Sequence, residues 1–139
     1  VGGMDERYVK GAHREESDFC LRISRRFGFF LFDPLARLVH IGNRKGGIRS
    51  WTHQSNVKAQ HHFDGNMYFM FNMLPLRQWP EYLLLSLYYF AINRAVLRNP
   101  KDFFTALGRF GKALKTGYRQ SRQGPKRLKN PVTEAKHAV

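Results

Sequence analysis

The chain is organised around the stretch His13-Arg14-Glu15-Glu16-Ser17-Asp18-Phe19-Cys20-Leu21-Arg22, which places three acidic residues within four positions. Half of the ten Asp and Glu residues lie before position 19, although the formal net charge is +14. Apolar side chains recur at helical spacing through this stretch and predict a helix from about Arg14 to Phe27 that ends at Gly28. The acids then occupy the first turn, where the helix dipole favours negative charge.

The clustered carboxylates have two interpretations. In the first they complement the helix dipole and pair with nearby arginines, which is a structural role. In the second, one carboxylate is held within reach of a substrate hydroxyl and acts as a general base. Successive helical residues point about 100° apart, so Glu16 could face a cleft while Glu15 accepts a bond from a loop. Spacing alone leaves both interpretations open.

The composition limits the class of protein and its partners. A net charge of +14 and a pI near 10.5 indicate an anionic partner, such as nucleic acid, acidic lipid or a phosphorylated substrate. An apolar share of 42% with twelve Phe and six Tyr provides for a core and excludes a disordered tail. Cys20 is the only cysteine, so no intrachain disulfide forms, and its place on the apolar helix face predicts a buried side chain.

Two short apolar runs predict strands. The first, Phe29-Phe30-Leu31-Phe32, is followed by a turn signal and predicts a buried strand. The second, Leu38-Val39-His40-Ile41, ends at a glycine, and the polar stretch from Arg44 to Ser55 after it predicts a mobile loop. With the preceding helix, these elements indicate an α/β unit in the first 55 residues.

The rest of the chain predicts helices. Asn56 to Met73 has an aromatic and methionine-rich face, and Tyr82 to Ile92 is an apolar run shorter than the roughly 20 residues of a bilayer span. Asn99 and Pro100 form a helix-start signal and predict a helix with one apolar side and one basic side. This pattern is typical of a helix in a membrane interface and extends over about Tyr82 to Leu128.

Histidines are the other candidate site residues. His40 ends a predicted strand and could be a metal ligand or a switchable base, although a single histidine there is more often a surface or core residue. His61 and His62, with Asn66 about one turn later, could be ligands or contacts to an anion. Their spacing matches no strong metal motif.

Four separated blocks resemble a known family. They are Gly2-Gly3-Met4-Asp5-Glu6, Arg14 to Arg22, Gly28-Phe29 with Phe32-Asp33-Pro34, and Val39-His40-Ile41-Gly42. In this order and at these intervals they resemble the second half of the catalytic domain of family-2 glycosyltransferases of the GT-A fold. From His61 to about Lys129 the chain is similar to the C-terminal helical extension of members that build cell-surface polysaccharides.

The resemblance implies a role for each candidate residue. Glu16 takes the position of the general base that deprotonates the acceptor hydroxyl in an inverting transfer. The family more often has Asp there, which keeps Glu15 as an alternative base. Asp18 is implied to fix a loop, and His40 to contact the divalent ion or the donor diphosphate. The substrate-binding residues implied in this way are Gly2, Gly3, Asp5, Asp18, His61, His62 and Asn66.

The sequence therefore predicts the C-terminal part of a membrane-associated inverting glycosyltransferase. Residues 1–55 would form the C-terminal part of an α/β, Rossmann-like GT-A domain, residues 56–123 a helical membrane-interface extension, and residues 124–139 a disordered basic tail. The chain contains no Asp-x-Asp metal motif and no nucleotide-binding βαβ unit. It is therefore expected to be a fragment that is inactive alone, with the divalent metal (Mg or Mn) bound mostly by residues outside it.

The expected partners are a nucleotide-sugar donor, a glycan or lipid-linked acceptor, and an anionic membrane surface. The expected location is cytoplasmic, peripheral at the inner face of the cell membrane. No nucleic acid is expected, because no recognition motif is visible and the aromatic residues lie with the apolar residues rather than between the basic ones. The alternative is a small basic membrane-surface or nucleic-acid-binding protein without catalysis, in which the acids only stabilise a helix.

Overall fold

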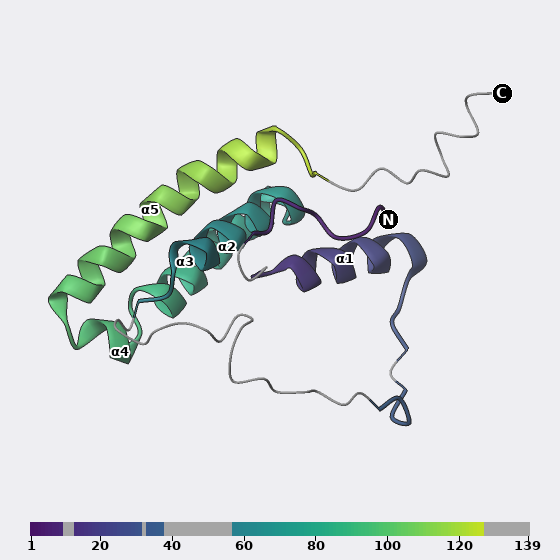
Figure 1. Ribbon diagram of the computed structural model, residues 1–139, viewed down its shortest axis with the longest axis horizontal. Coiled ribbons are helices and arrows are strands. Elements are labelled where there is room, and N and C mark those ends of the chain that lie inside the picture. The colour runs from purple at the N-terminus through teal and green to yellow at the C-terminus, as the bar shows by residue number, and fades with distance from the viewer. Residues whose placement is uncertain (10–12, 32, 38–56, 127–139) are drawn as a thin grey trace.

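The structure is a computed structural model that describes residues 1–9, 13–31, 33–37 and 57–126. The described residues form helices and contain no strand. The helices are α1 (Glu15–Phe27), α2 (Gln60–Met73), the one-turn 3-10 helix η2 (Leu76–Gln78), α3 (Trp79–Phe90), α4 (Arg94–Leu97) and α5 (Pro100–Arg122). Figure 1 shows them gathered around α2, with α5 lying along it.

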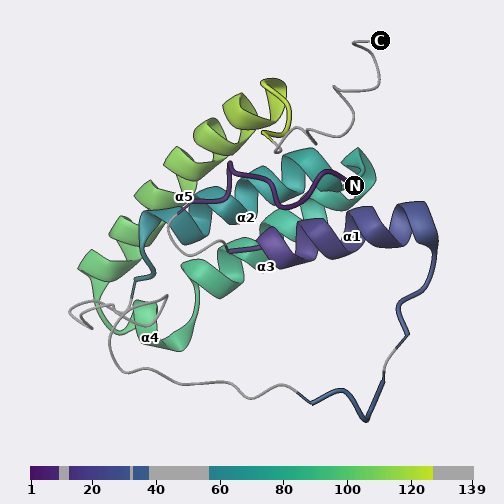
Figure 2. The same ribbon diagram turned by 45° about the vertical axis from the view of Figure 1, so that its right-hand side comes forward.

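The helix α2 is the centre of the fold because it contacts α1, α3 and α5. Arg14 and Arg25, at the two ends of α1, bond to Asn66 and to the Met73 carbonyl, so α1 runs in the same direction as α2. The α3 helix returns in the opposite direction, and α5 runs again with α2 (Figure 2). The largest buried side chains of the core are Phe63, Met67, Tyr68, Met70 and Val96.

The α2 and α5 helices approach each other closely at Gly117. A Cβ atom placed on Gly117 would lie 2.7 Å from the Tyr68 nitrogen and 2.8 Å from the Met67 carbonyl carbon. Real Cβ atoms do not approach backbone at such distances, so the crossing requires glycine at this position. This packing covers the apolar side of α5, where Ala106, Phe110 and Ala113 are buried.

The predicted start of the last long helix is confirmed. Asn99 is the N-cap of α5, and its side-chain oxygen accepts a hydrogen bond of 3.0 Å from the Lys101 nitrogen. Pro100 occupies the first helical position, where its missing N–H has no cost. Local signals of this kind do not depend on the rest of the fold, which is why the sequence predicts this boundary correctly.

The predicted α/β fold is wrong for the described residues. Phe29 to Leu31, predicted as a buried strand, is irregular, and its ends are almost fully exposed, with relative exposures of 101% for Phe29 and 97% for Leu31. A strand needs a neighbour for its backbone groups, and no described segment provides one. Residues 1–55 therefore do not form part of a Rossmann-like GT-A sheet where they are described. The second predicted strand, Leu38 to Ile41, and the loop from Arg44 lie outside the described residues.

The α1 helix occurs where the sequence predicts it, but it buries a different face. The buried residues of α1 are Asp18 and Arg22, whereas Phe27 is exposed and Cys20 is also exposed. The prediction of a buried Cys20 is therefore wrong. The reason is the ion pair of 2.9 Å between Asp18 and Arg22, whose guanidinium also donates to backbone carbonyls of the N-terminal segment. These bonds compensate the burial of a charged face.

The two ends of the described chain meet beside α2. The Asp5 carboxylate is fully buried and accepts bonds from the Tyr68 hydroxyl at 2.7 Å and from the Lys126 nitrogen at 2.9 Å. The Glu6 nitrogen donates to the Lys126 carbonyl at 2.8 Å. Gly2 and Gly3 before them have φ angles of 76° and 70°, which glycine adopts without strain. The N-terminal segment is thus held against both α2 and the end of α5.

Within the part of the chain that the structure describes, no helix is both long enough and apolar enough to cross a membrane.

Candidate functional site

The candidate site lies where the start of α1 meets α2 and α3. Arg14, the residue before α1, has a φ of 73°, which is uncommon for a residue with a side chain and is often found at functional sites. Gly65 of α2 makes this approach possible, because a Cβ there would lie 2.6 Å from the His13 carbonyl oxygen. The backbone at His13 and Arg14 therefore lies directly against α2, and the Arg14 side chain reaches Asn66.

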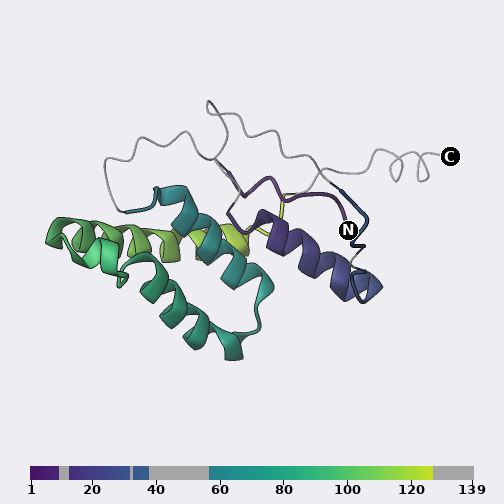
Figure 3. The ribbon, with the colours of Figure 1, turned by 90° about the horizontal axis from the view of Figure 1, so that it is seen from below.

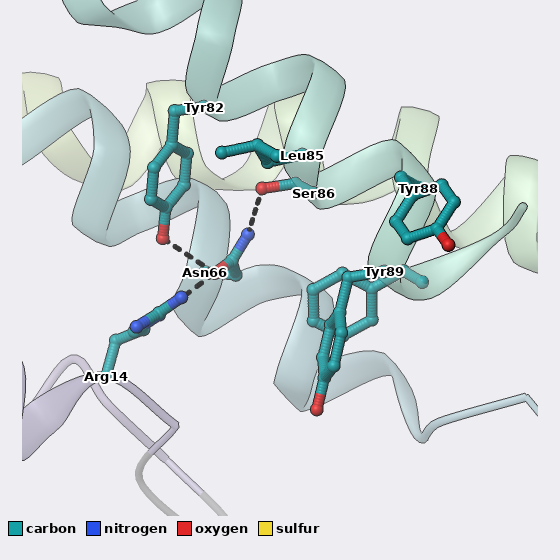
Figure 4. A pocket seen from close by; sticks show the side chains of 8 residues that line it. Arg14, Asn66, Tyr82, Leu85, Ser86, Tyr88 and Tyr89 are labelled. Carbon is teal, nitrogen blue, oxygen red and sulfur yellow. Dashed lines mark hydrogen bonds between the residues drawn. The ribbon is translucent and has the colours of Figure 1, made fainter. Parts of the chain in front are cut away.

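Asn66 is buried and connects three elements through its amide group. Its oxygen accepts bonds from the Arg14 Nε at 3.2 Å and from the Tyr82 hydroxyl at 2.7 Å. Its nitrogen donates to the Ser86 Oγ at 2.8 Å. Figure 4 shows these four side chains converging from the start of α1, from α2 and from α3. Burial raises the pKa of Tyr82, with the nearby Arg14 opposing the shift, so the phenol is kept as a donor.

A cavity of about 320 Å³ lies beside this polar group. Its volume is at the lower end of the range for small-molecule pockets. Its walls combine a few polar groups with aromatic rings, which is the usual composition of such pockets. The lining residues are Arg14, Asn66, Tyr82, Leu85, Ser86, Tyr88, Tyr89 and Phe90.

The Arg14 guanidinium also lies over aromatic rings. Its central carbon is 5.8 Å from the ring centres of Phe69 and Tyr82, within the range of a cation–π interaction. The Lys58 ammonium lies 4.1 Å from the ring centre of Tyr89, which lines the cavity, and donates to the Tyr89 hydroxyl. One cation thus lines the cavity and a second contacts a lining residue, and this positive charge favours a ligand with negative or strongly polar groups.

Three histidines lie near this site, and one of them, His13, contacts the lining residue Phe90. The His13 and His62 rings lie 5.5 Å apart, His61 and His62 lie 4.2 Å apart, and His13 also contacts Phe90 at 6.0 Å. Burial, followed by the charges of Arg14, His62, Lys58 and His61, lowers the pKa of His13 to about 4. Burial, followed by His61 and Lys58, lowers the pKa of His62 to about 4. Both rings are therefore neutral at pH 7.

The acidic residues of α1 divide into two groups. Asp18 is fully buried and bonds to Arg22, which donates to the carbonyls of Val1 and Gly3, at 2.5 and 2.7 Å respectively, and so holds the N-terminal segment. By contrast, the side chains of Glu15 and Glu16 form no hydrogen bond or ion pair with any residue in the described ranges. Glu16 is exposed in the first turn of α1, two residues after Arg14.

The structure brings together some of the sequence-predicted site residues and separates others. Asn66 lines the cavity and bonds to Arg14, and His61 and His62 lie nearby through the ring contact of His62 with His13. Glu15 and Glu16 follow Arg14 in the chain but are not among the residues that line the cavity. Gly2, Gly3 and Asp5 lie instead in the segment held by Arg22 and Tyr68, where the Asp5 carboxylate is occupied by structural bonds. His40 lies outside the described residues.

Sequence reasoning missed the residues that α3 contributes. Tyr82, Ser86 and Tyr89 occur at intervals of four and three positions and therefore lie on one side of α3. The apolar run Tyr82 to Ile92 as a whole gave no sign of a site. Two polar residues were the available signals: Ser86 within this run, and its partner Asn66 within the methionine-rich helix.

No group of three or more His, Cys, Asp or Glu side chains in the described ranges could hold a metal ion. The predicted metal contact, His40, is not among those residues. Comparison of the chain with protein-family models, with curated proteins and with solved structures finds no match in any of the three.

Proposed function

We propose that this chain carries the acceptor side of an inverting glycosyltransferase, with Glu16 as the general base. The observation that carries the proposal is the pair of carboxylates, Glu15 and Glu16, in the first turn of α1, which form no bond with any described residue and directly follow Arg14, a residue that lines the cavity. The order of the four sequence blocks supports it. The proposal concerns the chemistry at the start of α1 and does not need the sheet that the described residues lack.

The proposed reaction moves one proton and exchanges one bond at the sugar. The Glu16 carboxylate takes the proton of an acceptor hydroxyl as the hydroxyl oxygen bonds to the anomeric carbon. The bond from this carbon to the nucleotide diphosphate breaks at the opposite face, which inverts the configuration. The proton ends on Glu16, and the electron pair of the broken bond leaves with the diphosphate.

The cavity has groups suited to an acceptor sugar. Asn66, Tyr82 and Ser86 offer donors and acceptors for hydroxyl groups, and their mutual bonds fix these groups in place before a ligand binds. The exposed rings of Tyr88 and Tyr89 offer flat apolar walls with polar edges. Arg14 adds a cation for an acceptor that carries a phosphate.

The donor and its metal are not assigned to the described residues. A developing charge on the diphosphate calls for a divalent ion or basic groups, and the described side chains include no group of ligands that fits a metal. The nucleotide sugar and a divalent ion (Mg or Mn) would therefore be bound by other residues. The proposal for this chain is limited to the base and the acceptor cavity.

The decisive experiment is Glu16→Gln in the natural protein that carries this sequence. The readout is transfer of labelled sugar from a panel of UDP-, GDP- and dTDP-sugars to membrane lipids and glycans. We expect Glu16→Gln to reduce transfer by about 10² to 10⁴-fold, because the amide cannot accept the proton, while donor binding is retained. Glu16→Asp should keep measurable transfer.

Two controls separate the base from general effects of charge. Glu15→Gln tests the neighbouring carboxylate as the alternative base, and Glu6→Gln removes an exposed acid that pairs with Lys126 at 3.0 Å. Full transfer by Glu16→Gln together with loss in Glu15→Gln would move the role to Glu15. Full transfer by both variants, or no transfer by the natural protein with any donor, would leave the alternative of a basic membrane-surface or nucleic-acid-binding protein.

A further inference from the structure

The α3 helix presents an apolar face that no described residue covers. Leu84, Leu85 and Tyr88 have relative exposures of 67%, 58% and 64% and lie within an arc of about 100° on the helix. Tyr89 flanks this arc and is also exposed. We refer to these four residues as the α3 face. In Figure 3, α3 lies at the lower edge of the molecule, and no other helix lies below it.

Basic residues follow the α3 face at its C-terminal end. Figure 3 shows α4 directly after α3, and the exposed basic side chains in and just after α4 are Arg94, Arg98 and Lys101. Leu97 between them is also exposed. The acidic residue on the same side of α3 is Glu81, at the opposite end of the helix. An apolar patch with basic residues at one end suits a surface that has an apolar interior and anionic groups at its boundary with water.

The cavity of the candidate site opens on this same face. Leu85, Tyr88 and Tyr89 line the cavity and are at the same time exposed. A second cavity of about 220 Å³, lined by Leu74, Gln78, Glu81, Tyr82 and Leu85, shares Tyr82 and Leu85 with the first. A ligand in the cavity would therefore project from the α3 face.

We propose that the α3 face docks on an anionic lipid bilayer surface and presents the cavity to it. Tyrosines at the edge of an apolar patch suit the boundary between acyl chains and head groups, and arginines beside them are attracted to anionic lipids. A second copy of the chain is a poorer occupant, because two molecules of net charge +14 would bring their arginines together. If the proposed glycosyl transfer also holds, the acceptor that this face presents to the cavity is lipid-linked; this last point rests on the proposed function.

The test is binding of the chain to vesicles, which needs neither donor nor acceptor. The probes are vesicles of phosphatidylcholine alone and vesicles with roughly one third phosphatidylglycerol, compared by co-sedimentation at low and high salt. We expect binding to the anionic vesicles that weakens with salt. Leu84→Ser with Tyr88→Ser should reduce this binding by about tenfold or more, because two exposed side chains that would enter the bilayer are lost.

Matched variants keep the test specific. Leu31→Ser with Leu35→Ser removes two apolar side chains elsewhere that are even more exposed, at 97% and 80%, and should leave binding unchanged. Arg94→Gln with Arg98→Gln should weaken binding to the anionic vesicles by about tenfold and leave binding to neutral ones unaffected. Circular dichroism of each variant should show the helix content of the wild type, because the substituted positions are exposed.

Three results would overturn the proposal. They are absence of vesicle binding, equal binding by wild type and the α3-face variant, and a wild-type dimer that the α3-face variant converts to a monomer without any vesicle binding. The Glu16→Gln variant should bind vesicles like the wild type. Vesicle binding without any sugar transfer would therefore end the proposed function and leave the lipid-binding face intact.

Discussion

At the scale of single residues, Asn66 is the point at which three elements are joined. Its amide is almost fully buried, and each of its three bonds reaches a different side chain, on the start of α1 and on α3. Replacing Asn66 should lower stability, because its partner Ser86 is buried and its partner Tyr82 is partly buried, so both would lose a bond away from bulk water. Asn66 therefore supports both the fold and the shape of the cavity.

Replacing Asn66 by alanine should lower the free energy of unfolding by about 1–3 kcal/mol, since buried donors and acceptors lose their partner. Asn72 provides a matched control on the same helix, because its side-chain nitrogen forms no bond within the described ranges. Asn72→Ala should change stability by less than about 0.5 kcal/mol. Urea denaturation of the two variants measures the difference, and equal losses would show that the Asn66 bonds contribute little.

The two buried histidines make stability depend on pH. His13 and His62 have a pKa of about 4 in the folded chain, against about 6.5 when unfolded. Between these values the unfolded chain binds more protons than the folded chain, so stability rises with pH over this window. The contribution of the two neutral histidines to the free energy of unfolding is complete above about pH 6.5 and is lost as the pH falls toward 4.

Urea midpoints measured between about pH 4.5 and pH 7 should therefore fall at the acidic end. The charges that face the two rings, from Arg14, Lys58 and His61, oppose protonation and keep the shift in this direction. Replacing both His13 and His62 by glutamine removes the titrating groups and should flatten the dependence. An unchanged slope in the double variant would assign the pH effect to other groups.

At the scale of helices, the α2–α5 crossing is set by one glycine. Gly117→Ala should lower the free energy of unfolding by about 1–3 kcal/mol, because the added methyl group would meet the backbone of Met67 and Tyr68. Gly111→Ala in the same helix is the matched control, since nothing lies within 4 Å of its added carbon. That variant should gain roughly 0.5–1 kcal/mol from helix propensity. Thermal or urea unfolding measures both changes, and a loss of stability in Gly117→Ala with a gain in Gly111→Ala would confirm the close crossing.

Helices were predictable from the sequence where their signals are local. The Asn99–Pro100 start of α5 and the acidic first turn of α1 follow from caps and charges within a few residues. Phe29 to Leu31 shows the opposite case, because an apolar run becomes a strand only beside another strand. The buried face of α1 was also unpredictable, since Arg22 is buried by carbonyls of a segment about 20 positions away.

At the scale of the whole molecule, the site is assembled from distant positions. Arg14 and Asn66 are 52 positions apart, and Asn66 and Ser86 are 20 apart. The sequence indicated the acids of α1 and the polar residues of α2 as separate candidates, and their residue types were informative. The contact of Arg14 with Asn66 depends on Gly65, whose missing side chain admits the His13 backbone. No pattern of spacing reports such a contact.

The described ends of the chain are joined through Asp5, so the whole fold should respond to its loss. Asp5→Ala would leave the buried Tyr68 hydroxyl and the Lys126 amide without their acceptor and should cost about 2–5 kcal/mol. Glu6→Ala next to it removes a surface ion pair worth at most about 1 kcal/mol. Hydrogen exchange distinguishes the two. Asp5→Ala should speed exchange at Lys126 and at the N-terminal amides together, because both segments lose one common anchor, whereas exchange confined to residues 5–7 would show that α5 holds its end independently.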